Sequence, residues 1–179
     1  MTKTIKDYFE TLPQNEDDLV IVSDEIWKLG SLKEIKEKVS PELFTAHVIM
    51  NIIGNWQSDR WEGIINYHPD LFPYVSQALT AIKKPDIKEA FVSLIELFPN
   101  YVLFENGGAD VDVFYNNLMN FLADDNFEAD DERLKKYSKE EHAQLCLKFN
   151  NQMEILEDLS DSLYDWDSVI NYISENYDA

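Results

Sequence analysis

The sequence predicts a single all-α domain, a bundle of about nine helices. Only 5 Gly and 6 Pro occur in 179 residues, which is too few turn-forming residues for a fold of many short strands. Apolar residues make up 45% of the chain and aromatic residues 13%, so a real core can form and a disordered acidic chain is excluded. In most segments the apolar residues recur every three or four positions, which is the spacing of one helix face.

Residues 1–39 are expected to hold the N-terminal helices of this domain. The first helix ends before Pro13, because the residue preceding a proline disfavours the helical conformation. The acidic pair Asp17 and Asp18 opens the second helix, and Gly30 ends it. The expected ranges are residues 5–11, 17–29 and 31–38.

Residues 40–179 are expected to complete the same domain. Ser40, Pro41 and Glu42 form a clear start signal: a capping serine, a proline at the first helical position and an acid in the first turn. We expect that helix to stop at Gly54, after which helical periodicity resumes. The helices predicted from this start onward cover residues 41–54, 56–67, 70–82, 86–98 and 110–122.

The last third of the chain carries a second clear start signal. Ser138 and Glu141 match the capping-box pattern and predict a long helix to about residue 163. Asp165 is expected to cap a final helix over residues 166–177.

Two segments have weaker helical signals. The sequence leaves a minor strand open at residues 101–104, and the acidic residues 124–136 are expected to form a loop with a short helix. Oxygen-bearing side chains alternate at the start of this acidic segment, but Lys135 stands where an EF-hand loop has its bidentate Glu. We therefore predict no metal site there.

The charge balance limits the classes of partner. The chain has 35 acidic and 15 basic residues, a formal net charge of −20, well beyond the magnitude of about 2–8 of a comfortably soluble small domain. Nucleic acid and anionic membranes would repel such a surface, so a functional partner is expected to be basic. The alternative is that the excess charge serves solubility alone.

The acids are concentrated toward the C-terminus. Residues 121–179 contain 16 acids and 5 bases, against 11 and 7 in residues 1–60, and eight acids but no base follow Lys148. In the long predicted helix, acids recur along one face and apolar residues along the opposite one. Like charges at this spacing repel one another, and an ordinary solvated face normally mixes the two signs.

Two acidic segments are therefore candidates for a partner-binding surface. One helix carries five carboxylates over roughly 16 Å, whereas duplex DNA carries about ten charges over the same distance. A surface that imitates DNA would thus need both segments, or a second copy of the chain. The candidate residues are Asp124, Asp125, Glu128, Asp130, Asp131, Glu132, Glu154, Glu157, Asp158, Asp161, Asp165 and Asp167.

From about Ser40 onward the chain contains the stretches Trp61-Glu-Gly-Ile-Ile-Asn-Tyr67, Gln77-Ala-Leu-Thr-Ala-Ile82, Ile87-Lys-Glu-Ala-Phe-Val-Ser-Leu-Ile-Glu-Leu-Phe-Pro99, Asp158-Leu-Ser-Asp-Ser-Leu-Tyr164 and Tyr172-Ile-Ser-Glu-Asn-Tyr-Asp178. Together these stretches resemble the bacterial DNA-mimic protein family, which consists of small acidic helical proteins. This chain has Trp61-Glu62-Gly63-Ile64 where that family usually has an Asn-Gly-Gly-Phe turn.

The resemblance implies an all-α and often dimeric protein whose carboxylates are placed like backbone phosphates. It implies a DNA-binding target, for instance a helix-turn-helix regulator that the protein would keep off its operator. The lysines and arginines of such a regulator could meet carboxylates in place of phosphates.

Signals for catalysis are weak. His47, His68 and His142 form no metal-ligand pair, and we expect His47 at the edge of the core and the other two at the surface. The sequence has no nucleophile motif and no phosphate-binding loop, so we expect that the protein binds no cofactor and is not an enzyme. The single cysteine, Cys146, is expected to be packed among apolar residues.

The expected compartment is the cytoplasm, because the sequence shows neither an apolar signal segment nor a stretch near the roughly 20 apolar residues of a membrane span. The leading hypothesis is an acidic protein-binding module, a DNA mimic that occupies the basic surface of a transcription regulator. Two alternatives stay open: an immunity or antitoxin-type protein that neutralises a basic nuclease toxin, and an enzyme with an unrecognised site. The last of these predicts a deep pocket with a strongly perturbed carboxylate or histidine.

Overall fold

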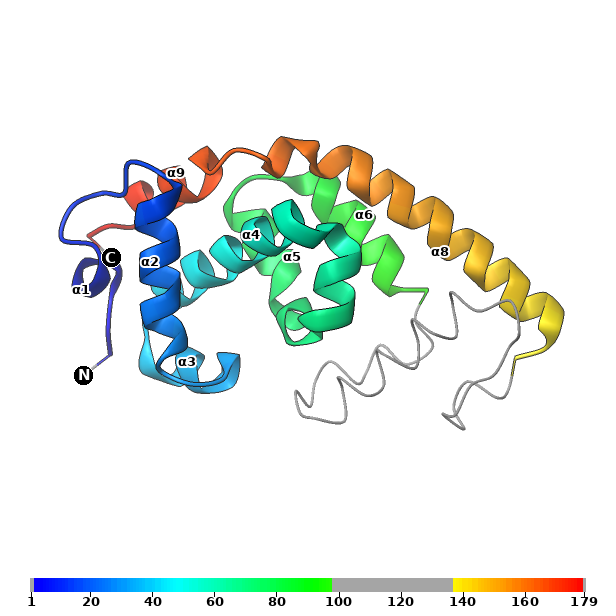
Figure 1. The fold of residues 1–179 in the computed structure, drawn as a ribbon, viewed down its shortest axis with the longest axis horizontal. Coiled ribbons are helices and arrows are strands. Elements are labelled where there is room, and N and C mark those ends of the chain that lie inside the picture. Colours follow the sequence, from blue (N-terminus) through cyan, green and yellow to red (C-terminus); the bar gives the residue numbers. More distant parts are fainter. Residues whose placement is uncertain (1, 98–136, 179) are drawn as a thin grey trace.

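The computed structural model describes residues 2–97 and 137–178 (Figure 1). These ranges contain eight α-helices and no strand, which confirms the all-α prediction. The elements are α1 (Ile5–Tyr8), α2 (Glu16–Trp27), α3 (Leu32–Lys38), α4 (Pro41–Tyr67), the 3-10 turn η1 (Pro69–Leu71), α5 (Phe72–Ala81), α6 (Pro85–Ile95), α8 (Lys139–Ser160), the 3-10 turn η3 (Asp161–Leu163) and α9 (Asp167–Glu175).

Helix α4 is the centre of the packing. Helix α5 packs on it and α6 packs on α5, α8 lies along α6, and α9 returns across α4 toward α2 at the other end of the molecule (Figure 1). The core contains the fully buried indoles of Trp56 and Trp61. The ring centroids of Trp61 and Phe91 are 5.4 Å apart, which joins α4 to α6.

The two start signals predicted at Ser40 and Ser138 are confirmed. The Ser40 hydroxyl accepts a hydrogen bond from the Leu43 backbone N–H at 3.2 Å, which satisfies one of the free amides of α4. At Ser138 both halves of the capping box are present, and the Glu141 carboxylate accepts from the Ser138 backbone N–H at 2.7 Å. Gly30 follows the end of α2, as predicted, and its φ of +126° is a backbone conformation that glycine adopts readily.

Helix α4 does not stop at Gly54 as predicted. It continues to Tyr67, because the indole of Trp166 lies against the backbone at Gly54, where a Cβ would meet it at 3.6 Å. The break in α4 lies six positions later, at Arg60, whose φ of 60° and ψ of −169° are non-helical. This packing outweighs the low helix propensity of glycine.

Two further boundaries differ from the predictions. Helix α2 is capped by Asn15, whose side chain accepts from the Asp18 backbone N–H at 3.1 Å, so the start lies before the acidic pair. Asp165 does not cap α9: the capping position is Trp166, which makes no side-chain capping bond, and Asp165 is exposed. The predictions for residues 101–104, 110–122 and 124–136 lie outside the described ranges.

His142 was expected at the surface and is buried. Its Nε2 atom lies 3.4 Å from the Sγ atom of Cys146, one turn further along α8, and Cys146 is half-buried as a packed cysteine would be. His47 is fully buried. In the described ranges, no helix combines the length and the apolar character needed to cross a membrane.

Candidate acidic binding groove

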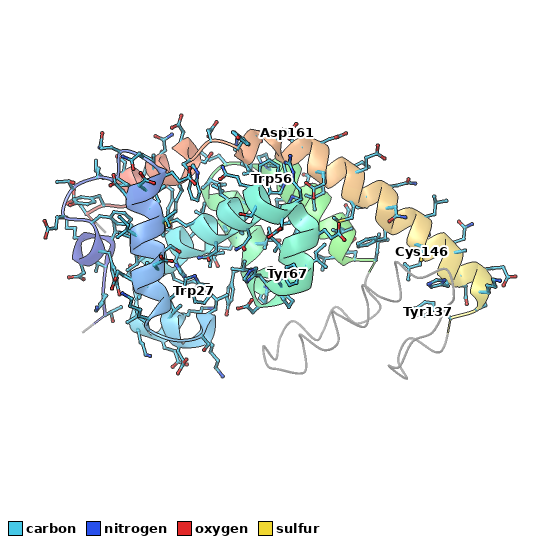
Figure 2. The ribbon with its side chains drawn as sticks, viewed as in Figure 1. Trp27, Trp56, Tyr67, Tyr137, Cys146 and Asp161 are labelled. Atoms are coloured by element: carbon cyan, nitrogen blue, oxygen red, sulfur yellow. The ribbon has the colours of Figure 1, made fainter. Side chains whose placement is uncertain are left out.

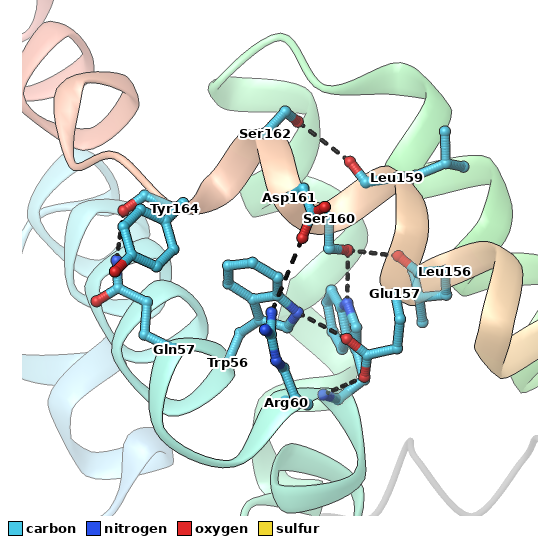
Figure 3. Close-up of polar contacts among 11 residues, drawn as sticks. Trp56, Gln57, Arg60, Leu156, Glu157, Leu159, Ser160, Asp161, Ser162 and Tyr164 are labelled. Atoms are coloured by element: carbon cyan, nitrogen blue, oxygen red, sulfur yellow. Dashed lines mark hydrogen bonds and ion pairs between the residues drawn. The ribbon is translucent and has the colours of Figure 1, made fainter.

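The site begins at the break in α4. Because Arg60 is non-helical, the Trp61 backbone N–H loses its partner in the preceding turn. The carboxylate of Glu157 on α8 replaces that partner: one oxygen accepts from the Trp61 N–H at 2.8 Å and the other accepts from the Trp56 indole N–H at 2.9 Å. Glu157 thus caps the last part of α4 from another helix (Figure 3).

A second contact joins the same two helices below Glu157. The Trp61 indole N–H donates to the Ser160 hydroxyl at 2.6 Å, and that hydroxyl donates to the Leu156 carbonyl at 2.6 Å. Ser160 and Leu156 are fully buried. The C-terminal end of α8 is therefore held in one position relative to the break in α4.

The surface above these contacts is a hollow of about 500 Å³ between α4 and α8, which we call the acidic groove. Five of its seven lining residues are acidic. Figure 2 places Asp161 at the outer edge of this region and Trp56 inside, between the two helices. The lining residues are Arg60, Glu62, Met153, Glu154, Glu157, Asp158 and Asp161.

Arg60 is the only base among the described residues that line the groove. Its guanidinium lies over the Trp56 ring, 4.7 Å from the centroid, and its Nη1 atom is 3.9 Å from a carboxylate oxygen of Asp161. Both side chains of this ion pair are mostly exposed, so it contributes little to stability. One guanidinium against five carboxylates leaves the groove strongly negative.

The structure separates the predicted candidate residues into three sets. Glu154, Asp158 and Asp161 are exposed in the groove, whereas Glu157 is half-buried and occupied by the two tryptophan donors. Asp165 and Asp167 are exposed beyond η3 and do not line the groove. The remaining candidates lie outside the described residues: Asp124, Asp125, Glu128, Asp130, Asp131 and Glu132.

Bases from elsewhere in the fold neutralise only part of the C-terminal acids. Lys83 pairs with Glu175 at 2.9 Å, and Lys6 pairs with Asp178. In the described ranges, Glu154, Asp158, Asp165 and Asp167 form no ion pair. The acids of the groove therefore form one field of one sign, apart from Arg60.

Glu62 is the acidic groove residue that the sequence analysis missed. It lies two positions after the break at Arg60 and lines the hollow together with the acids of α8. No local pattern marks it, because its position depends on which helix α8 packs against.

A second hollow, of about 460 Å³, lies between α2 and α4 beside the buried His47. The Oγ atom of Ser23 is 3.5 Å from Nδ1 of His47, and burial lowers the pKa of His47 to about 4. Among the described residues no carboxylate contacts the imidazole, which instead meets the Asn51 amide at 3.3 Å and the Trp27 ring edge. A neutral histidine of such low pKa is a poor general base, so this arrangement favours a structural role over nucleophilic catalysis.

The fold and the groove together define an acidic all-α protein with a carboxylate-lined hollow between two helices. No family model, curated protein or solved structure matches the chain. The resemblance to the bacterial DNA-mimic family therefore stays a prediction.

Proposed function

We propose that this chain is a cytoplasmic acidic binding protein that acts as a DNA mimic and occupies the basic DNA-binding surface of a transcription regulator. The observation that carries the proposal is the acidic groove, in which carboxylates of α8 and Glu62 of α4 converge around a single guanidinium. Lysine and arginine side chains that bind phosphates also bind carboxylates, through charge-assisted hydrogen bonds.

The groove carries a cost that solubility alone does not require. Glu154, Asp158 and Asp161 follow one another at helical spacing, and each like-charge pair costs a few tenths of a kcal/mol. A surface in which both signs of charge are interspersed can be soluble without that repulsion. A concentrated field of one sign is useful where it attracts and orients a partner of the opposite sign.

The charge density of the groove approaches that of DNA without reaching it. From Glu154 to Asp161 the helix axis advances by roughly 10 Å, over which duplex DNA carries about six charges. Three exposed carboxylates lie along this length, Glu154 and Asp158 on α8 and Asp161 at the start of η3, and Glu62 adds a fourth from α4.

The test is capture of proteins from a cell lysate by the immobilised full chain, compared with two variants of equal net charge. The groove variant carries Glu62→Gln, Asp158→Asn and Asp161→Asn. The control variant removes three exposed acids far from the groove, by Glu10→Gln, Asp24→Asn and Glu37→Gln. Because each variant loses three negative charges, any difference in capture reports position and not total charge.

The proposal expects a DNA-binding protein to be retained by the native chain and the control variant at low salt, and to be lost from the groove variant. Duplex DNA is expected to displace it, and retention is expected to fall steeply as salt rises. Equal capture by the two variants, or retention that salt and DNA leave unchanged, would contradict the proposal. A captured nuclease would favour the immunity-protein alternative.

A further inference from the structure

The acidic groove already holds one cation, which belongs to the chain itself. The guanidinium of Arg60 lies over the Trp56 ring, with its carbon 4.7 Å from the ring centroid (Figure 3). Its Nη1 atom is 3.9 Å from a carboxylate oxygen of Asp161. A planar guanidinium stacked on an aromatic ring beside a carboxylate is an arrangement by which proteins bind arginine side chains.

The indole beneath Arg60 is held in place by the fold. Trp56 is fully buried, and its N–H donates to one carboxylate oxygen of Glu157 at 2.9 Å, which fixes the orientation of the ring. The other oxygen of Glu157 accepts from the Trp61 backbone N–H at 2.8 Å, which fixes the carboxylate. The ring and the carboxylate at its edge therefore keep their positions without the help of the Arg60 side chain.

The Arg60 side chain, by contrast, is held weakly. It is 57% exposed and its partner Asp161 is 83% exposed, so the ion pair between them is worth little. The backbone of Arg60 has a φ of 60° and a ψ of −169°, a conformation that glycine adopts far more readily. Glycine would thus form the same break in α4 with less strain, and the fold does not require an arginine at this position.

We propose that the Trp56 ring and the carboxylates around it form an arginine-binding site, in which Arg60 is an intramolecular ligand that inhibits binding. This inference rests on the proposed function, because the basic partner supplies the competing arginine. On binding, the guanidinium of the partner replaces that of Arg60 over the ring, and the Arg60 side chain moves into solvent. The exchange forms the same contacts that it breaks, so Arg60 removes the gain that an arginine would otherwise obtain from the ring.

The site distinguishes arginine from lysine. A guanidinium is flat, stacks on an aromatic face and presents a fork of donors to a carboxylate, whereas an ammonium is compact and strongly hydrated. Glu62 and Asp158, which line the groove without contacting the ring in any described interaction, attract both cations. The contact with Trp56 is therefore the one that favours arginine, and it is the contact that Arg60 occupies.

The experiment measures binding of two blocked peptides to the full chain by calorimetry at fixed salt. One peptide alternates glycine with arginine, and the other alternates glycine with lysine. We expect the native chain to bind the two peptides with similar affinity, because Arg60 occupies the ring. The variant Arg60→Gly vacates the ring and is expected to bind the arginine peptide about three- to tenfold more tightly than the lysine peptide.

The ratio of the two affinities separates an empty ring from a more negative groove. Loss of one positive charge strengthens the binding of both peptides by the same factor, so an unchanged ratio in Arg60→Gly would overturn the proposal. Lys33→Gln is the matched control, because it removes one exposed positive charge on α3, outside the groove, and should leave the ratio unchanged. In the nuclear magnetic resonance spectrum of Arg60→Gly, the Trp56 indole N–H signal should shift more with the arginine peptide than with the lysine peptide.

Peptide binding and protein capture can fail independently. A chain that captures a DNA-binding protein through the groove, but whose Arg60→Gly variant shows no preference for the arginine peptide, keeps the proposed function and loses the arginine site. A chain that captures no DNA-binding protein, but whose Arg60→Gly variant selects the arginine peptide, has the arginine site without the proposed function. Circular dichroism of Arg60→Gly, expected to equal that of the native chain, shows that the variant still folds.

Discussion

The carboxylate of Glu157 accepts one hydrogen bond on each of its oxygens, from the Trp56 indole and from the Trp61 backbone. The exposed Glu154, one turn earlier on α8, has no such partner among the described residues. Two acids that look equivalent in the sequence thus have different roles. Glu157 holds α8 on α4, and Glu154 contributes only to the field of the groove.

Replacing Glu157 by glutamine should therefore destabilise the protein more than the same change at Glu154. The amide keeps one acceptor oxygen but turns an NH₂ group toward the second donor, which is then unsatisfied. We expect Glu157→Gln to lower the free energy of unfolding by about 1–3 kcal/mol, and Glu154→Gln to change it by no more than about 0.5 kcal/mol. Urea denaturation measures both, and equal effects would show that the two bonds to Glu157 do not hold α4 and α8 together.

Burial of His47 predicts a pH dependence of stability. The folded pKa of about 4 lies below the ordinary value of 6.5, so the unfolded chain binds the proton more tightly. The stabilisation from neutral His47 is complete above pH 6.5 and is lost as pH falls from 6.5 toward 4. Relative to a His47→Gln variant, the native chain should lose about 2 kcal/mol of stability between pH 7 and pH 5.

The comparison with His47→Gln is needed because protonation of the many carboxylates acts in the opposite direction on both proteins. The difference between the two free energies of unfolding removes that common effect. A difference that stays constant from pH 7 to pH 5 would mean that His47 titrates normally in the folded protein.

At the scale of elements, the break in α4 stores backbone strain at Arg60. Its φ of 60° with ψ of −169° is a conformation that only glycine adopts readily. At an ordinary helical position alanine is more stable than glycine by about 0.5–1 kcal/mol. At position 60 this order should reverse, with Arg60→Gly more stable than Arg60→Ala by about 1 kcal/mol or more.

The control for this prediction is the neighbouring exposed helical residue Ser58. There, Ser58→Ala is expected to be more stable than Ser58→Gly, as in any helix. Thermal or urea unfolding of the four variants gives both differences. If alanine is the better residue at position 60 as well, the break is not strained.

The helix starts could be predicted from the sequence because their signals are local. Ser40 and Ser138 each lie within four residues of the amides and acids that complete their caps. The break at Arg60 could not be predicted, because the group that compensates for it is distant in the sequence. The carboxylate of Glu157, 96 positions after Trp61, accepts the hydrogen bond from the Trp61 amide that the break exposes. The helix end predicted at Gly54 was wrong, because the packing of Trp166 against Gly54 cannot be read from the local sequence.

For the candidate site, too, the sequence predicts the local arrangement of residues but not the packing between helices. Helical spacing predicts that Glu154, Asp158 and Asp161 share one side of α8, and all three are exposed in the groove. The same spacing assigned Glu157 to that surface, although it turns toward Trp56 and Trp61. Periodicity places a residue on a face, but it does not show which neighbouring helix that face meets, so Glu62 was also missed.

For the whole molecule, the formal net charge of −20 opposes folding, because every acid is closer to its neighbours in the compact state. Four ion pairs join the described residues, and all of them have exposed side chains, so they offset little of this repulsion. The last third of the chain contributes most of the imbalance, including the groove. The proposed function and stability are therefore opposed at this surface.

This opposition predicts that the protein becomes more stable as salt rises. Between about 10 mM and 0.15 M salt the Debye length falls from about 30 Å to about 8 Å, so salt screens the repulsion between the acids. Each like-charge pair at helical spacing costs a few tenths of a kcal/mol, and the free energy of unfolding should therefore rise on the order of 1 kcal/mol. Adding the three groove substitutions Glu62→Gln, Asp158→Asn and Asp161→Asn should raise stability at low salt and reduce the salt-induced gain. Stability that falls with salt would instead mean that attractive pairs outweigh the repulsion, and the groove would then not be a field of one sign.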